Sequence, residues 1–298
     1  MNSLDENSVH SSFKRIIPSW VQKAGMSSIL KYRQATWRNR SLPDFIIIGA
    51  QKSGTTSLYR YLSQHPQLIA SYKKEVHFFD GGIDNYYVDN FEKGEAWYRA
   101  NFPRKRKSNT SQKVFEASPL YLFNPLVPQR IYDFMPEVKL IAILRNPVER
   151  AISHYFHAKR KQGVGVETLP MLEAFQAEEE RLKPIVKQQD FKNPIFRRHS
   201  YKGKGLYYEQ LKRYLNYFSN KSILVLDSES FFAVPDDGLR MIFEFVGVDS
   251  GFTVPDLKPG NVGKNKVEVG LDVYDYLENY FEPCNQKLYK LLGRSFSW

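Results

Sequence analysis

The sequence predicts an α/β domain in which a central parallel sheet is flanked by helices. Three short apolar runs, at residues 45–49, 138–145 and 222–229, have the length and the β-branched content of buried strands. Apolar residues at helical spacing follow each run, and strands that alternate with helices are typical of parallel sheets. With 298 residues and 42% hydrophobic content, the chain is long enough for one large domain.

The first run ends at Gly49 and leads into a short polar loop. Apolar side chains then recur at helical spacing from Leu58 to Leu62, and His65-Pro66 ends the pattern. The order is therefore strand, glycine-containing loop and helix.

The second and third runs repeat this order. The second run ends in Arg145, and Asn146-Pro147 opens the helix that follows. A helix also follows the third run and is expected to stop at Gly247. Between these two units, residues 162–202 are polar and helix-prone. We expect this segment to be an insertion over the sheet edge that helps to shape the site of a substrate.

Residues 1–42 form a basic extension to the predicted domain at 43–298. Lysines and arginines alternate there with apolar residues, which favours helices packed on the domain over helices bound to a membrane surface. The first residues lack the apolar core of a signal peptide, and no run approaches the roughly 18 apolar residues of a membrane span. Because Cys284 is the only cysteine, no intrachain disulfide can form. These features predict a cytoplasmic protein without stable membrane association.

The chain carries a formal net charge of +11, which predicts a surface that attracts anions. Phosphates, sulfates and nucleic acids all satisfy this condition. The sequence contains no nucleic-acid recognition motif and no regular alternation of basic and aromatic residues. We therefore expect no nucleic-acid partner, and the sequence does not indicate an oligomeric state.

The loop between the first strand and its helix has the composition of a phosphate site. Backbone N–H groups at a helix start, together with the helix dipole, bind anions. Gly49 and Gly54 allow a tight turn and a close approach. Lys52 adds a positive charge, and hydroxyl groups follow it.

The position of the lysine separates this loop from that of a nucleoside-triphosphatase. Such loops place a lysine directly after their second glycine, where it reaches the β- and γ-phosphates. Thr55 occupies that position here, and Lys52 lies inside the loop. The second predicted strand also ends in Arg145 and not in a magnesium-binding aspartate. A P-loop kinase is therefore the weaker alternative to an enzyme that uses a phosphosulfate.

The segments GAQKSGTTSLYRYLSQHP and KKEVHFFD together resemble the sulfotransferases that use 3′-phosphoadenosine 5′-phosphosulfate (PAPS). The similarity is to the branch of heparan sulfate 3-O- and N-sulfotransferases and related bacterial enzymes of secondary metabolism, and it extends over residues 44–298. It implies a P-loop-like fold and PAPS as cosubstrate, with 3′,5′-ADP as product. It further implies that Lys52 contacts the phosphosulfate, which is also held by Ser53, Gly54, Thr55, Thr56 and Ser57.

The second motif carries the catalytic base that the resemblance implies. Glu75 takes this role, His77 assists it as a further catalytic residue, and Lys74, His77 and Asp80 contact the acceptor. A positioned carboxylate can remove the proton of a hydroxyl group as that group attacks sulfur, while Lys52 stabilises the charge on the leaving phosphate. No ligand cluster with metal spacing is present in the sequence, so we expect direct in-line transfer without a metal.

Two further segments are implied to bind the nucleotide. In LRNPVERAISHY, Arg145 and Ser153 match the family's ligands for the 3′-phosphate. In GLYYEQL, Tyr207 is a candidate contact to the nucleotide, although a core helix would use a tyrosine equally well. Near the end of the chain, Lys264 and Lys266 are candidates for a nucleotide-covering loop, although the residues around them depart from the family pattern.

The acceptor is not fixed by these motifs. Heparan 3-O enzymes carry a lysine where this chain has Ala117, and together with the missing N-terminal anchor this favours a soluble small molecule, such as a secondary metabolite or toxin. An anionic glycan remains the alternative. Five basic residues would suit such a glycan: Lys73, Lys74, Lys159, Arg160 and Lys161.

Overall fold

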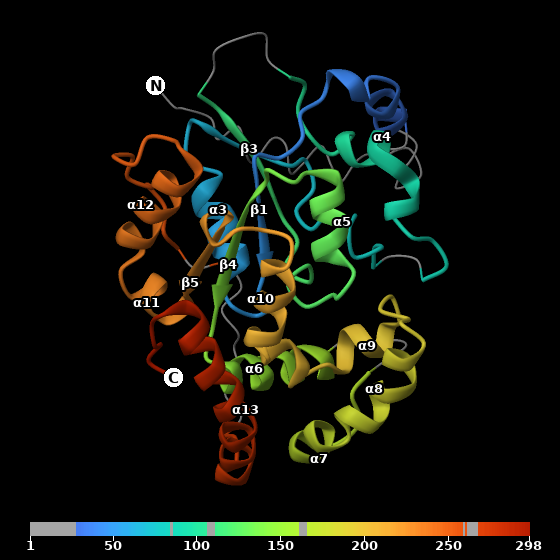
Figure 1. The fold of residues 1–298 in the computed structure, drawn as a ribbon, viewed down its shortest axis with the longest axis vertical. Helices are drawn as coiled ribbons and strands as arrows, with labels where there is room; N and C mark the ends of the chain where they lie inside the picture. Colours follow the sequence, from blue (N-terminus) through green and yellow to red (C-terminus); the bar gives the residue numbers. More distant parts are fainter. Residues whose placement is uncertain (1–27, 84–85, 106–110, 161–165, 259, 261–267) are drawn as a thin grey trace, which may run out of the picture.

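A five-stranded parallel sheet forms the centre of the molecule (Figure 1). The computed structural model describes residues 28–83, 86–105, 111–160, 166–258, 260 and 268–298. The strand order is β2-β3-β1-β4-β5, and every neighbouring pair is parallel. The strands are β1 (Phe45–Gly49), β2 (Leu68–Ala70), β3 (Lys113–Ala117), β4 (Lys139–Leu144) and β5 (Ile223–Asp227).

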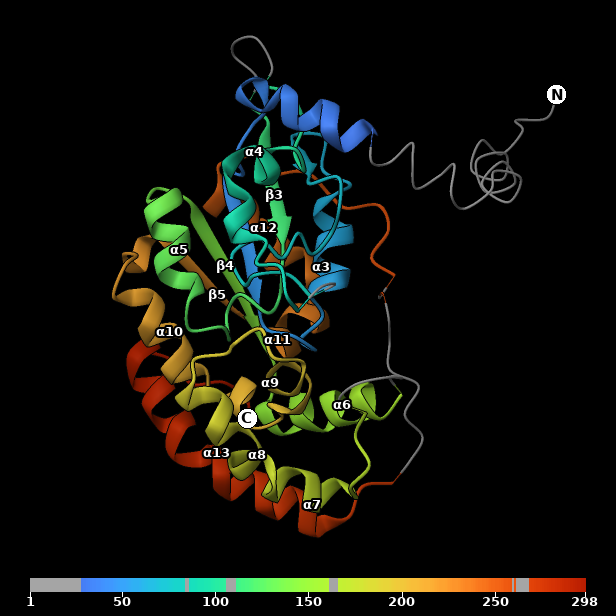
Figure 2. The ribbon, with the colours of Figure 1, turned by 90° about the vertical axis from the view of Figure 1, so that its right-hand side faces the viewer.

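Helices cover both faces of this sheet, which Figure 2 shows from the side. One face carries α3 (Thr55–Leu62), α11 (Ser228–Ala233) and α12 (Pro235–Val246). The other carries α5 (Val127–Phe134), α10 (Tyr207–Leu215) and α13 (Leu271–Leu292). The predicted α/β class is therefore confirmed.

The pleat of β1 explains why both faces are covered. Successive side chains of a strand point to opposite sides. Ile46 and Ile48 accordingly lie in the cluster under α5 and α10, whereas Phe45 and Ile47 lie in the cluster under α3 and α12. All four side chains are fully buried, so an unbroken apolar run is what this central strand requires.

The predicted strands at 45–49, 138–145 and 222–229 are confirmed as β1, β4 and β5. The helix α12 ends at Gly247, which adopts a left-handed φ of 80°, as the stop signal predicts. Two strands were missed. β2 has only three residues, and β3 carries Glu116 among its apolar residues, so neither produces a clear apolar run.

The polar segment after α6 (Pro147–Lys159) does not lie over a sheet edge, and that expectation was wrong. Its helices are α7 (Met171–Gln176), α8 (Glu178–Lys187) and α9 (Pro194–His199), and they pack on one another and on α6 and α13. They lie beyond the carboxyl ends of the strands (Figures 1 and 2), whereas the sheet edges are β2 and β5.

Part of the basic extension is described. Residues 28–35 are helical, and the short helix η1 (Trp37–Asn39) packs on α4 (Gly94–Arg99). Arg40 is buried and donates hydrogen bonds to the carbonyls of Arg33 and Phe102. Across the described ranges, no helix has both the length and the apolar character that a membrane crossing requires.

Candidate active site

The loop predicted to bind phosphosulfate joins the carboxyl end of β1 to the start of α3. Lys52 and Gly54 adopt left-handed φ values of 74° and 84°. A Cβ atom at Gly54 would lie 2.2 Å from the Phe232 ring, so only glycine fits there. The amide of Ala50 donates to the Ile143 carbonyl of β4 at 2.8 Å. The loop is therefore a tight turn that is fastened to the neighbouring strand.

The hydroxyl residues of this loop differ in their surroundings. Ser53 is 1% exposed, and its Oγ has no hydrogen-bond partner among the described residues. Thr55 is buried and Thr56 half-buried. Ser57 Oγ accepts a hydrogen bond from the Gly260 amide at 2.9 Å, so this hydroxyl already contacts the backbone of Gly260.

Arg145 comes to the same loop from the next strand. It directly follows β4, which pairs with β1, and its Nη1 donates to the Lys52 carbonyl at 3.3 Å. Its Nη2 lies 3.3 Å from Glu149 on α6. Ser153, one turn further along α6, is half-buried. Two sequence motifs that are 93 residues apart thus meet at one end of the sheet.

Tyr207, the candidate nucleotide contact on α10, lies in the interior beside Arg145. The side chain is fully buried, and its hydroxyl donates to the Arg145 carbonyl at 2.9 Å. It therefore fixes the backbone from which the Arg145 side chain extends. Lys264 and Lys266, the other candidates in this group, lie outside the described residues.

The segment that carries the predicted base is fixed at the carboxyl end of β3. The Glu75 amide donates to the Ala117 carbonyl at 3.0 Å, and the His77 amide donates to Ser118 Oγ at 3.3 Å. Glu75 and His77 adopt left-handed φ values of 62° and 52°. Non-glycine residues rarely adopt such values, which cluster at functional sites.

Four side chains of this segment form one chain of ion pairs. Lys74 Nζ lies 2.5 Å from Glu75 Oε1, and His77 Nε2 lies 3.4 Å from Glu75 Oε2. His77 Nδ1 lies 2.7 Å from Asp80 Oδ2. The exposed fraction of the side chain falls from 39% at Glu75 to 3% at His77 and 1% at Asp80.

These contacts determine the charges. Burial by itself lowers the pKa of His77, but the carboxylates of Asp80 and Glu75 raise this pKa to about 9. Burial raises the pKa of Glu75, but the hydrogen bond from His77 and the charge of Lys74 outweigh burial and lower it to about 2. At neutral pH the imidazole is therefore charged, and Glu75 is a carboxylate that is able to accept a proton.

Asp80 was predicted to contact the acceptor, but its side chain is only 1% exposed. It pairs with His77 and accepts a hydrogen bond from the Gly82 amide at 3.3 Å. In this structure Asp80 holds the His77 ring in place, and its contact with an acceptor stays a prediction.

Replacing Asp80 with Asn is expected to lower the pKa of His77 from about 9 toward its unfolded value of about 6.5, because burial is then opposed by the carboxylate of Glu75 alone. In the wild type, the folded pKa exceeds the unfolded one. The stabilisation from charged His77 is thus present below about pH 6.5 and lost as the pH rises through 9. NMR titration of the ring measures both pKa values. An unchanged pKa in the variant would refute the pairing.

Sequence reasoning missed one buried acid beside this site. Glu116 on β3 is fully buried and accepts hydrogen bonds from the Tyr98 hydroxyl at 2.6 Å and from Ser118 Oγ at 3.0 Å. Burial raises its pKa to about 7. The only signal in the sequence was an acidic residue inside a weak apolar run.

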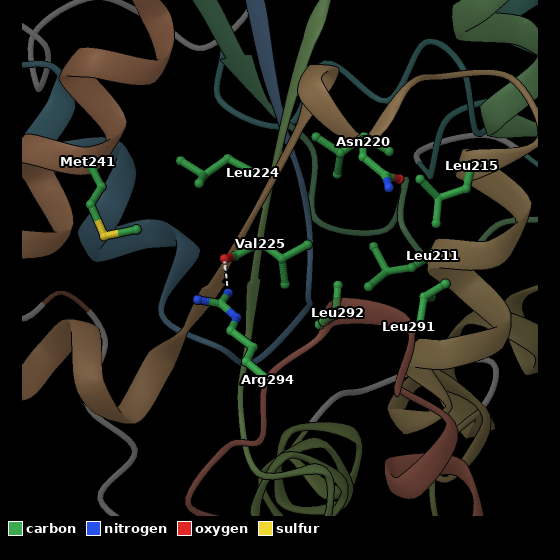
Figure 3. Close-up of a pocket in the computed structure, with 10 residues that line it drawn as sticks. Leu211, Leu215, Asn220, Leu224, Val225, Met241, Leu291, Leu292 and Arg294 are labelled. Carbon is green, nitrogen blue, oxygen red and sulfur yellow. Dashed lines mark hydrogen bonds between the residues drawn. The ribbon is translucent and has the colours of Figure 1, made fainter. Parts of the chain in front are cut away.

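Figure 3 shows a cavity of about 370 Å³. It opens at the β5 edge between α10 and α13, and Arg294 on its wall donates to the Val225 carbonyl. None of the predicted site residues lines it. In the described part of the chain, no group of three or more His, Cys, Asp or Glu residues is arranged to hold a metal ion.

The fold, together with a lysine-bearing loop between its central strand and the next helix, defines a P-loop-like α/β protein. Comparison with known proteins identifies the family to which the chain belongs. The model of the sulfotransferase domain matches residues 42–258, and the chain belongs to this family of PAPS-dependent enzymes.

Three relatives illustrate the similarity. A crystal structure of a sulfotransferase from Alicyclobacillus acidocaldarius is 35% identical and has a TM-score of 0.68, and the match covers 86% of this chain and 98% of that one. Human heparan sulfate glucosamine 3-O-sulfotransferase 5 is 28% identical over 87% of this chain and 75% of its own length. The membrane-associated sulfotransferase kil1 of Dictyostelium discoideum is 28% identical over 86% of this chain, which spans 66% of that protein. The resemblance to heparan sulfate enzymes is thus confirmed.

Proposed function

We propose that the enzyme transfers the sulfuryl group of PAPS directly to a hydroxyl or amine of a soluble small molecule and releases 3′,5′-ADP. One observation carries the proposal: three groups suited to this reaction lie at the carboxyl ends of three adjacent strands. Lys52 follows β1, the Glu75 segment is fixed to the end of β3, and Arg145 follows β4. Ligands of open α/β sheets bind at this end, where the strand order reverses.

The chemistry divides between two of these groups. As the acceptor oxygen or nitrogen forms its bond to sulfur, its proton passes to Glu75, and the bond between sulfur and the bridging oxygen of the phosphate breaks. Negative charge then builds on that oxygen. Lys52 and the amides at the start of α3 stabilise this charge, with Ser53, Thr55, Thr56 and Ser57 around them. No covalent enzyme intermediate and no metal is needed.

The neighbours of Glu75 orient it. Charged His77 donates to one carboxylate oxygen, and Lys74 pairs with the other, so the carboxylate is held in one position. Lys74 is partly exposed and contacts the acceptor in this proposal, whereas Asp80 acts through His77.

Arg145 and Ser153 bind the 3′-phosphate, which distinguishes PAPS from ATP. The Arg145 side chain is 30% exposed and lies at the donor loop, which suits it to an anionic ligand. A guanidinium binds phosphate through paired hydrogen bonds. A P-loop kinase remains the weakest alternative, because Thr55 stands where such a kinase has its lysine.

The main alternative acceptor is a glycan. Heparan sulfate appears in the names of several relatives, and Lys73 and Lys74 precede the base, where they would suit an anionic polymer. A small molecule is favoured because Ala117 is a fully buried methyl side chain at the position where heparan 3-O enzymes carry a lysine. We place the protein in the cytoplasm, since the sequence offers one cysteine and no membrane-spanning run.

The test is transfer itself. Purified enzyme incubated with PAPS and a panel of hydroxyl- and amine-bearing small molecules, with desulfated heparan oligosaccharides alongside, is expected to increase the mass of a small acceptor by about 80 Da, one SO₃ group, in mass spectrometry. Modification of the oligosaccharides alone would replace the small-molecule proposal with the glycan alternative. Consumption of ATP in place of PAPS would reject sulfuryl transfer.

A further inference from the structure

Lys204 is a buried lysine that touches the donor loop from outside the four sequence motifs. It lies in the short helix η3 (Gly203–Gly205) and is 2% exposed. Its Nζ donates to Gln51 Oε1 at 2.9 Å and to the Arg197 carbonyl at 2.5 Å. Gln51 directly precedes Lys52, so Lys204 links the loop to the segment between α9 and α10.

The charge around Lys204 is unusual for a protein interior. Both acceptors of its hydrogen bonds are neutral oxygens, and its Nζ lies 5.6 Å from the centre of the Phe123 ring. A buried ammonium group normally has an anionic partner, because removing it from water is costly. Lys204 makes its direct contacts without one.

A second buried cation increases this imbalance. Arg150 is fully buried and close enough for its charge to act on Lys204. One of its nitrogens donates to the Tyr201 carbonyl, whereas Nε and Nη1 have no hydrogen-bond partner among the described residues. Glu178 is the carboxylate whose charge acts on both cations, and burial raises its own pKa to about 7. Burial and the charge of Arg150 lower the pKa of Lys204 well below its usual value, and an anion bound at the loop would favour the charged form of this lysine.

We propose that Lys204 is a positioning residue of the donor site, which holds the loop at Gln51, where the 5′-phosphosulfate binds. This inference rests on the proposed function. Lys204 acts on the loop at Gln51, while Arg145 binds the carbonyl of the next residue, Lys52. The two cations thus hold consecutive residues of one turn.

The test compares two ligands in calorimetric titrations of the full chain. Lys204→Met keeps most of the side-chain length and removes the charge. This variant should bind 3′,5′-ADP about tenfold or more weakly than the wild type, which is the usual effect of losing a hydrogen bond to a charged group. Binding of 3′-AMP, which lacks the 5′-phosphate, should stay within about twofold, measured by competition.

Two further variants separate positioning from general damage. Gln51→Leu breaks the same hydrogen bond at its other partner, the half-buried Gln51 side chain. The double variant should bind 3′,5′-ADP no more weakly than Lys204→Met alone, because both changes remove the same interaction. Lys202→Met is the matched control: this lysine is also 2% exposed, but its Nζ contacts Glu179 and Tyr276 and not the loop. It should leave 3′,5′-ADP binding within about twofold.

The outcomes are distinguishable. If the wild type binds 3′,5′-ADP and Lys204→Met binds it equally well, this inference fails while the proposed function stands. The inference would also be overturned if Lys204→Met lowered the affinities for 3′-AMP and 3′,5′-ADP equally. The same holds if the losses of affinity in the double variant were additive. If the wild type itself binds no 3′,5′-ADP, the proposed function fails first.

Discussion

Replacing Glu75 with Gln is expected to reduce kcat by at least about a hundredfold, within the 10²–10⁴-fold range of a positioned general base. The amide has the shape of the carboxylate but cannot accept the acceptor's proton. Because Glu75 is fixed at the end of β3 and not in the donor loop, affinity for 3′,5′-ADP should stay within about threefold. Steady-state kinetics with PAPS and titration with 3′,5′-ADP measure the two effects.

Glu95→Gln serves as the control, because this carboxylate also makes a 2.5 Å ion pair, with Arg99, but lies on α4 away from the loop. It should retain full turnover. Equal kcat values for wild type and Glu75→Gln would remove Glu75 as the base.

Replacing Arg145 with Ala is expected to lower the affinity for 3′,5′-ADP by about tenfold to a hundredfold, because a charge-assisted contact to phosphate is lost. The expected loss is specific: affinity for 5′-AMP, which has no 3′-phosphate, should change much less. Titration with both nucleotides measures the difference.

The control for this variant is Arg240→Ala, which removes an exposed arginine from α12. Its nucleotide affinities should equal those of the wild type. An Arg145→Ala variant that loses both nucleotides equally would show that Arg145 serves the loop through the Lys52 carbonyl and not the 3′-phosphate.

The sequence was sufficient for the parts of the fold with a strong local signal. β1 and β4 are central strands buried on both faces, so they appear as unbroken apolar runs. Gly54 and Gly247 occupy left-handed positions that mark a tight turn and a helix end. β3 was missed because Glu116 interrupts its apolar residues, and only the tertiary contacts with Tyr98 and Ser118 make a buried carboxylate acceptable there.

The sequence motifs name candidate site residues, but they do not indicate how deeply each side chain is buried. The motifs named Glu75, His77 and Asp80 together, yet nothing in their spacing tells which side chain meets solvent, and the structure buries Asp80 behind His77. Tyr207 was ambiguous for the same reason. Lys204 gave no signal at all, because its contact with Gln51 joins residues 153 positions apart in the sequence.

The claim on which the account depends is that the loop after β1 holds the 5′ end of a 3′-phosphorylated adenosine nucleotide. Calorimetric titration of the wild-type protein with 3′,5′-ADP, in buffer with EDTA and without magnesium, tests it directly. The account predicts saturable one-to-one binding that is tighter than the binding of ADP under the same conditions. Absence of binding, or a preference for ADP, would contradict it.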